Sequence, residues 1–356
     1  MRDHVQRARQ YLAGNGVDAL LLVKAENRRY VTGFTGSAGI ALVTEGAALL
    51  AVDFRYYEQA AAQAASCEIL RGGADLPGAL AAAVRAHELR RIGFEAEFMP
   101  YAQVERLREK LSPVELVPLG DVDRVRWAKD DEEVAAIQRA AEISDAGFAH
   151  ILTVLRPGTT ERSAAVEFET YMRRAGADRL SFDLVFASGP RSALPHGRAT
   201  DRVLEAGDFV TLDFGPVWEG YTSDCTRTVV LGQPDDRQRE IYALVLEAQR
   251  RAIGAVRGGA SSRAVDAAAR GVIEAAGYGE AFGHGLGHGI GLEIHEGPSL
   301  SPRLDVPLEP GMVVTIEPGV YLPGWGGVRI EDDVVVTAEG CRVLTRAPKE
   351  LIVLPA

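Results

Sequence analysis

The C-terminal two thirds of the 356-residue chain contain an internal repeat, which limits the possible folds more than any other feature. Two segments superpose at a constant offset of 101 residues: "RPGTTERSAAVEFETYMRRAG" (156–176) and "RGGASSRAVDAAARGVIEAAG" (257–277). Each follows an amphipathic helical pattern and precedes strand-rich sequence. We therefore expect a duplicated unit of helix, turn, helix and strands, arranged about a pseudo-twofold axis with a cleft on that axis.

The segment before the repeat is typical of a smaller α/β domain without a catalytic cluster. We expect strands within 17–23, 39–52 and 91–97, and helices over 2–13, 55–66, 75–90 and 101–111. A stretch rich in Pro, Gly and charge then leads to Asp130 and Glu133, which resemble a capping box at a helix start. We place the domains at residues 1–124 and 125–356.

Composition excludes several classes of partner. The 50 acidic residues outnumber the 39 basic ones and give a formal charge of -11, which argues against nucleic acid or an anionic membrane. The three cysteines are odd in number and far apart, so a disulfide framework is not expected. The chain has no signal-like start and no apolar run of ~18 residues. We expect a cytoplasmic protein that binds neither nucleic acid nor membrane.

The first half of the repeat carries a pair of aspartates on strand-like sequence. The segment "FVTLDFG" (209–215) presents Asp213, and "YTSDCTRTVVL" (221–231) returns with Asp224. A hairpin would bring both carboxylates onto one face.

The second half carries a matching pair of glutamates. The segment "MVVTIEPGVYL" (312–322) presents Glu317, and "VRIEDDVVV" (328–336) presents Glu331 with Arg329 on the same side. Two hairpins therefore offer two acids each.

Three of the seven histidines lie in "FGHGLGHGIGLEIHE" (282–296). Its glycines disfavour a helix, so we expect an extended or looped segment. His284 and His288 then point to the same side, and the glycines allow close approach to the backbone. The alternative is a glycine-rich turn with incidental histidines.

Four carboxylates placed together among apolar residues require a compensating cation. Two divalent ions would offset the four negative charges, and His288 would add a neutral nitrogen ligand. A hydroxide held between the ions would be activated, because metal binding lowers the pKa of water. Hard oxygen ligands with one imidazole favour Mn²⁺, with Co²⁺, Zn²⁺ or Mg²⁺ as alternatives.

These motifs resemble a known enzyme family. "LDFG", "TSDCTRTV", "GHGLGHGIGLEIHE", "TIEPGVY" and "GVRIEDDVVV" are similar to the dinuclear metallopeptidases of the pita-bread fold, the creatinase, aminopeptidase P, prolidase and methionine aminopeptidase family. The resemblance covers residues 125–356, and "NRRYVTGFTGSAG" (27–39) resembles the N-terminal domain of the Xaa-Pro-cleaving branch. It implies an α+β chain, in which a smaller creatinase-type α/β domain precedes the pita-bread domain.

The resemblance also implies roles for individual residues. The implied metal ligands are Asp213, Asp224, His288, Glu317 and Glu331, with Asp224 and Glu331 bridging. The implied substrate and proton-transfer residues are His284 in the cleft, His295 at the scissile carbonyl, His196 beside the substrate, Glu317 as proton shuttle and Arg329 as support for a ligand carboxylate.

A metal-dependent exopeptidase that cleaves before proline is the implied activity. The compact N-terminal domain resembles that of small bacterial prolidases, so we expect an Xaa-Pro dipeptidase, with an Xaa-Pro aminopeptidase (aminopeptidase P) on longer peptides as the alternative. A peptide with proline at its second position is the expected substrate, and the family implies a homodimer. An inactive peptide-binding scaffold and a hydrolase of non-peptide substrates are the hypotheses of other classes.

Overall fold

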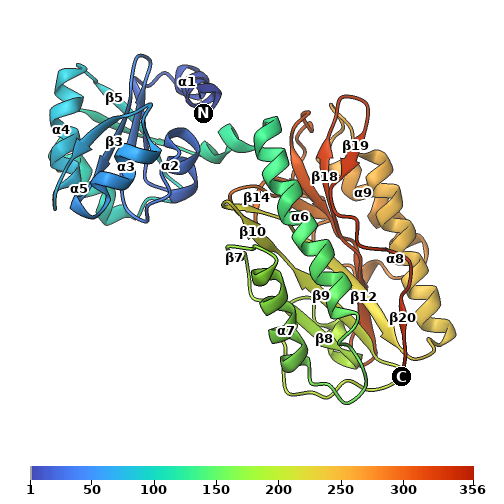
Figure 1. Cartoon of the computed structure of the whole chain (residues 1–356). Coiled ribbons are helices and arrows are strands. Elements are labelled where there is room, and N and C mark those ends of the chain that lie inside the picture. The colour runs from blue at the N-terminus through green and yellow to red at the C-terminus, as the bar shows by residue number, and fades with distance from the viewer. Residues whose placement is uncertain (1) are drawn as a thin grey trace. The chain divides into compact units, whose positions relative to one another are not determined.

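The computed structural model describes residues 2–356, with side chains from residue 4 onward. The chain divides into two compact units, Met1–Arg126 and Trp127–Ala356, and each combines helices with sheet (Figure 1). Among the described residues, no helix has both the length and the apolar character needed to cross a membrane.

The N-terminal unit is built on a six-stranded mixed sheet with strand order β4-β3-β2-β1-β5-β6. Its strands are β1 (Ala19–Leu22), β2 (Ile40–Thr44), β3 (Ala48–Val52), β4 (Glu68–Arg71), β5 (Arg91–Glu95) and β6 (Glu115–Leu119). Its helices are α1 (Arg2–Gly14), α2 (Ala25–Thr32), α3 (Tyr57–Gln63), α4 (Leu76–Ala86) and α5 (Tyr101–Leu111), with short 3₁₀ turns at Phe54–Tyr56 and Val122–Arg126. The central strand β1 is wholly apolar and wholly buried, as a sheet covered on both faces requires.

Most predicted elements of this unit are confirmed, and three were missed. The predicted strand region 39–52 is a hairpin of β2 and β3. Helix α2 was missed because no side chain caps its start after Lys24, so the usual signal is lacking. The two edge strands, β4 and β6, were missed because each leaves several residues partly or fully exposed and so lacks a buried apolar run.

The repeat predicted in the C-terminal unit is confirmed by its helices. Helix α7 spans Glu161–Arg174 and α9 spans Ser262–Ala275, so both are 14 residues long and start 101 residues apart. Each follows a longer helix, α6 (Asp131–Ile151) or α8 (Asp236–Ala255). Both long helices begin with a capping box, which confirms the one predicted at Asp130 and Glu133.

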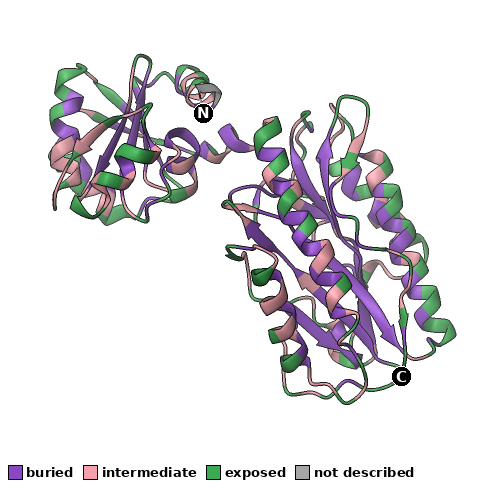
Figure 2. Ribbon diagram, viewed as in Figure 1, coloured by how far each residue is buried: buried purple, intermediate pink, exposed green. Residues whose placement is uncertain are grey.

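Each half of this unit has its own apolar core. One cluster packs α6 and α7 against first-half strands, and the other packs α8 and α9 mainly against second-half strands. Figure 2 shows these strands buried along most of their length, while the helices keep exposed outer faces.

The first-half strands are β7 (Arg179–Leu180), β8 (Val185–Ser188), β9 (Phe209–Phe214), β10 (Pro216–Trp218), β11 (Tyr221–Thr222) and β12 (Cys225–Leu231). The second-half strands are β13 (Gly287–Gly289), β14 (Glu296–Leu300), β15 (Val313–Ile316), β16 (Gly319–Leu322), β17 (Gly326–Arg329), β18 (Asp332–Val336) and β19 (Cys341–Val343), while β20 (Val353–Leu354) closes the first-half sheet. Two more 3₁₀ turns lie at Gly189–Ala193 and Gly279–Ala281.

Three of the four predicted acids lie at breaks between strands rather than within continuous strands. Asp224 lies between β11 and β12, Glu317 between β15 and β16, and Glu331 between β17 and β18. Only Asp213 is inside a strand, where it pairs with Thr226. The long strands expected over 221–231, 312–322 and 328–336 are therefore each interrupted, as strands commonly are next to functional sites.

Candidate active site

All nine residues singled out from the sequence line one pocket of about 820 Å³. They are His196, Asp213, Asp224, His284, His288, His295, Glu317, Arg329 and Glu331. Residues up to 135 positions apart thus meet at one place between the two halves of the repeat.

The four carboxylates are held close together with too few positive partners. The Oδ1 atoms of Asp213 and Asp224 are buried and have no hydrogen-bond partner among the described residues. Burial raises the pKa of Asp224 and Glu331 well above the usual range, and the neighbouring carboxylates raise both further. Burial likewise raises the pKa of Glu317 to about 8, even though Arg329 opposes the shift. Such orphaned acceptors and repelling charges fit a site built for cations.

His288 presents a lone pair, not a proton, to the carboxylates. Its Nδ1 lies 3.0 Å from the Gly289 carbonyl oxygen, which can only accept, so Nδ1 carries the hydrogen. Its Nε2 lies 3.4 Å from Oε1 of Glu317 and 3.7 Å from Oδ2 of Asp224. Burial, together with nearby His295, lowers the pKa of His288 to about 3, so the ring is neutral. An imidazole nitrogen lone pair that faces carboxylate oxygens in this way suits coordination of a metal ion between them.

Donor atoms of Asp224, His288 and Glu331 all lie within 4.8 Å of one another, so these three could hold one ion. Glu331 is oriented by Thr226, whose hydroxyl donates to its Oε2 at 2.6 Å. The residues present therefore fit divalent metal ions in number, charge and donor type.

Arg329 ties the pocket wall together. Its Nη2 donates to Oδ2 of Asp213 at 2.6 Å, and its Nε donates to the Thr226 hydroxyl at 3.0 Å. Its Nη1 donates to the Tyr321 hydroxyl at 2.8 Å and to the Pro195 carbonyl at 3.1 Å. Four of the five N–H groups of a guanidinium are thus used. The Pro195 contact also fixes the loop that carries His196.

Tyr321 links Arg329 to His284. The Nδ1 of His284 lies 2.8 Å from the Gly285 carbonyl and therefore carries the hydrogen, so Nε2 accepts from the Tyr321 hydroxyl at 3.0 Å. Burial lowers the pKa of His284 to about 4, which keeps the ring neutral. His295 lies edge-on to His288, with ring centroids 4.3 Å apart.

The predicted need for glycine around His288 is confirmed. A Cβ on Gly287 would lie 2.0 Å from the Thr315 carbonyl oxygen, and one on Gly289 would lie 2.2 Å from the Gly297 carbonyl oxygen. Strand β13 can therefore pass between its neighbours only with glycine on both sides of His288.

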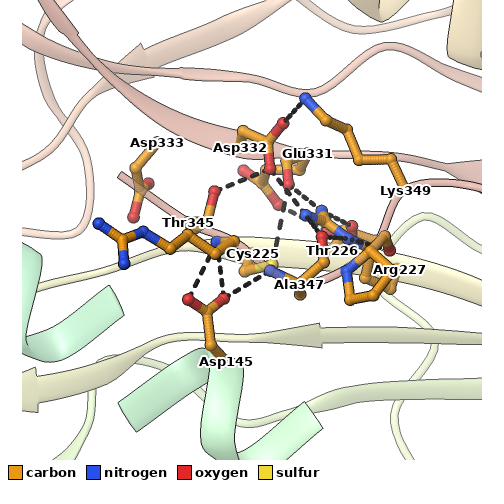
Figure 3. A network of polar contacts seen from close by, with 12 residues as sticks. Asp145, Cys225, Thr226, Arg227, Glu331, Asp332, Asp333, Thr345, Ala347 and Lys349 are labelled. Atoms are coloured by element: carbon orange, nitrogen blue, oxygen red, sulfur yellow. Dashed lines mark hydrogen bonds and ion pairs between the residues drawn. The ribbon is translucent and has the colours of Figure 1, made fainter. Parts of the chain in front are cut away.

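A buried polar network lies next to Glu331 (Figure 3). Arg227 donates from Nη1 to the Glu331 carbonyl and from Nη2 to Oδ1 of Asp332 at 2.7 Å. Asp332 also accepts from Thr345 at 2.7 Å and from Lys349 at 2.5 Å. The charge of Arg227 is therefore compensated, while its hydrogen bond holds the backbone of Glu331.

Asp333 holds Asp224, the second residue that the family resemblance implies as a bridging ligand. It accepts from the Ser223 hydroxyl at 2.7 Å and from the Asp224 backbone N–H at 3.1 Å. The sequence reasoning missed Asp333, Thr226 and Tyr321. Strand alternation could not have indicated Asp333, because a break between β17 and β18 separates it from the pattern of Glu331. Nothing local in "GVYL" indicated that the Tyr321 hydroxyl joins Arg329 to His284.

Comparison with known proteins agrees with this geometry. Residues 135–338 match the model of metallopeptidase family M24, and residues 4–127 match the creatinase/prolidase N-terminal domain. An Xaa-Pro dipeptidase structure from Bacillus anthracis superposes with a TM-score of 0.96 at 46% identity, covering 99% of each chain. The Xaa-Pro dipeptidase of Pyrococcus horikoshii is 38% identical over 99% of each chain.

A third neighbour carries a different activity in its name. The X-Pro aminopeptidase structure from Thermotoga maritima superposes with a TM-score of 0.89 at 41% identity, covering 95% of this chain and 98% of the other. The predicted architecture, an α/β N-terminal domain before a duplicated pita-bread domain, is confirmed by these matches. The chain therefore belongs to metallopeptidase family M24, with a creatinase/prolidase N-terminal domain.

Proposed function

We propose that this protein is a metal-dependent Xaa-Pro dipeptidase. One observation carries the proposal: four carboxylates and the neutral His288 converge in one pocket, where buried oxygens lack partners. The dipeptidases from Bacillus anthracis and Pyrococcus horikoshii, similar along nearly the whole chain, support the choice of substrate.

We propose that Asp213, Asp224, His288, Glu317 and Glu331 hold two divalent ions, with Mn²⁺ as the expected metal. Four hard carboxylates and one imidazole favour Mn²⁺ over metals selected by thiolate ligands. When bound, divalent ions polarise a substrate carbonyl and lower the pKa of water.

The protein's own groups then position the substrate and move protons. The carboxylate of Glu317 accepts a proton and passes it to the leaving proline nitrogen. His295 donates a hydrogen bond to the oxygen that becomes negative, and His196 helps to position the substrate. Arg329 keeps Asp213 in place through their hydrogen bond.

Proline at the second position explains the need for a specialised enzyme. Its nitrogen carries no hydrogen and its φ is fixed, so peptidases that require that donor or another conformer fail on it. The pocket has room for the ring, and Glu317 in its lining can supply the proton to the proline nitrogen.

The Thermotoga aminopeptidase favours Xaa-Pro aminopeptidase as the second candidate. Incubating the Mn²⁺-loaded protein with Ala-Pro, Met-Pro and Ala-Pro-Ala separates the two. A dipeptidase releases proline from Ala-Pro and Met-Pro and leaves Ala-Pro-Ala largely intact, whereas an aminopeptidase trims Ala-Pro-Ala efficiently. If none of the three peptides is cleaved, the peptidase proposal is wrong.

We also propose a homodimer and a cytoplasmic location. The free state of Cys67, Cys225 and Cys341 suits a reducing compartment. Light scattering on the purified protein measures the oligomeric state, and cell fractionation measures the location.

A further inference from the structure

The pocket has one permanent cation that the proposed chemistry does not use. Among the described residues that line it, the arginines are Arg198 and Arg329, and there is no lysine. Arg329 is buried and uses four of its N–H groups on the protein itself. Arg198 has 76% of its side chain exposed, so its guanidinium is open to an incoming ligand.

Strand pairing places Arg198 in line with the catalytic residues. Asp213 of β9 pairs with Val185 of β8, and Val185 forms an isolated bridge with Arg198. Residues paired in this way have side chains on the same face, and all three line the pocket. Because neighbouring strands lie about 4.8 Å apart, the Arg198 backbone is roughly 10 Å from that of Asp213.

The present partner of Arg198 can be displaced. Its Nη2 lies 2.9 Å from Oδ2 of Asp183, but both side chains are more than 70% exposed. An exposed ion pair of this kind contributes only about 0–1 kcal/mol. A ligand carboxylate can therefore take the guanidinium at little cost.

A dipeptide substrate needs such a cation. Its free carboxylate follows the scissile carbonyl by one residue, about 3.5 Å of chain. That carboxylate would enter a pocket lined by six acidic side chains: Asp183, Asp213, Asp224, Glu280, Glu317 and Glu331. Two divalent ions would offset the four ligand carboxylates, but Asp183 and Glu280 remain negative, so a positive group would favour binding of the substrate carboxylate.

We propose that Arg198 binds the free carboxylate of the substrate's proline and so makes the enzyme prefer Xaa-Pro dipeptides to longer or amidated peptides. The proposal rests on the proposed Xaa-Pro activity. It predicts that substrate affinity depends on the negative charge of the C-terminal carboxylate, to which the planar guanidinium can donate two hydrogen bonds.

Comparison of Ala-Pro with Ala-Pro amide tests this proposal, because the amide differs only in lacking the charge. With Ala-Pro, Arg198→Ala should raise KM about 2- to 5-fold, because the ion pair that it removes is exposed, with little change in kcat. With the amide, Arg198→Ala should match wild type. Arg198→Lys should fall between the two, because lysine keeps the charge but not the planar fork.

Arg162→Ala is the matched control. Arg162 is 60% exposed and paired with Asp201 at 2.7 Å, yet it does not line the pocket. It should leave KM for both substrates unchanged. Equal effects of Arg198→Ala on Ala-Pro and its amide, or no effect on either, would overturn the proposal.

A binding measurement separates this inference from the proposed function. Calorimetric titration of the Mn²⁺-loaded protein with L-proline and with prolinamide, neither of which has a peptide bond to cleave, should show proline binding that Arg198→Ala weakens and amide binding that it leaves unchanged. Wild type that cleaves no Xaa-Pro peptide would refute the dipeptidase function alone. Active wild type whose proline binding and whose KM for Ala-Pro do not depend on Arg198 would refute the role of Arg198 alone.

Discussion

Arg227 donates a 2.7 Å hydrogen bond to Asp332 in a fully buried ion pair that joins strand β12 of the first half to β18 of the second (Figure 3). The same guanidinium holds the carbonyl of Glu331, the residue before Asp332. The two halves of the repeat are therefore fastened together directly behind a proposed metal ligand.

Replacing Arg227 by methionine should destabilise the protein and weaken metal binding together. Removing one partner of a buried pair costs about 3–5 kcal/mol when the other charge is left alone, and Asp332 keeps its contact with Lys349, so we expect a cost at or below the lower end of that range. Urea unfolding of the metal-free protein and a Mn²⁺ titration measure the two effects. Arg250→Met is the control, since the Arg250–Glu350 pair is exposed at 54% and 74% and should contribute at most about 1 kcal/mol. Unchanged stability and metal affinity in Arg227→Met would contradict the supporting role.

Asp224→Asn should stabilise the metal-free protein while it weakens metal binding. The raised pKa of Asp224 means that its charged form is less favourable in the folded chain than in the unfolded chain. Each pKa unit is worth about 1.4 kcal/mol, so removing the charge should raise the free energy of unfolding at pH 7 by on the order of 1 kcal/mol. Chemical denaturation without Mn²⁺ measures the expected gain in stability, and denaturation with Mn²⁺ measures the expected loss of stabilisation by the metal. Lower stability of the metal-free variant would mean that the carboxylates do not repel one another.

The metal-free protein should lose stability as pH rises. The pKa of Glu317 is raised from 4.5 to about 8. Between these two pH values the folded chain therefore holds more protons than the unfolded chain. The stabilising contribution is complete below about pH 4.5 and is lost as pH rises through about 8. Melting temperatures between pH 5.5 and 8.5 should fall in EDTA beyond the trend shown by Glu317→Gln, and Mn²⁺ should remove the difference. Identical pH profiles for wild type and Glu317→Gln would argue against a raised pKa.

His295→Ala should keep the metal content of wild type and lose most of the rate. His295 contacts the ring of His288 but belongs to the substrate side of the pocket in our proposal. Losing one donor to a developing negative oxygen typically lowers kcat about 10²- to 10³-fold. Metal analysis by mass spectrometry and Ala-Pro kinetics test this, with the exposed His87→Ala as control. Full activity in His295→Ala would remove His295 from the mechanism.

The sequence predicted the repeat well because it depends on local patterns. Helices α7 and α9 could be aligned residue by residue, since their capping and turn residues recur with the same spacing. The acids and histidines of the pocket stood out because carboxylates rarely interrupt apolar strands without a ligand.

Features that depend on long-range contacts were not predictable. Asp332, the partner of Arg227, lies 105 residues away, and the sequence near either residue contains no pattern that indicates the pair. The position of Arg198 in the pocket depends on strand register, which one sequence does not fix where the bridge is isolated. The strand interruptions at Asp224, Glu317 and Glu331 were missed, because the alternation of apolar and polar residues does not show where a strand stops pairing with its neighbour.

Titrating metal-free protein with Mn²⁺, and counting bound ions by calorimetry and mass spectrometry, tests the central claim most directly. We predict two ions per chain in wild type, and loss of at least one in Asp224→Ala and in His288→Ala. A wild-type chain that binds no Mn²⁺, Co²⁺, Zn²⁺ or Mg²⁺, or variants that bind as many ions as wild type, would contradict the account.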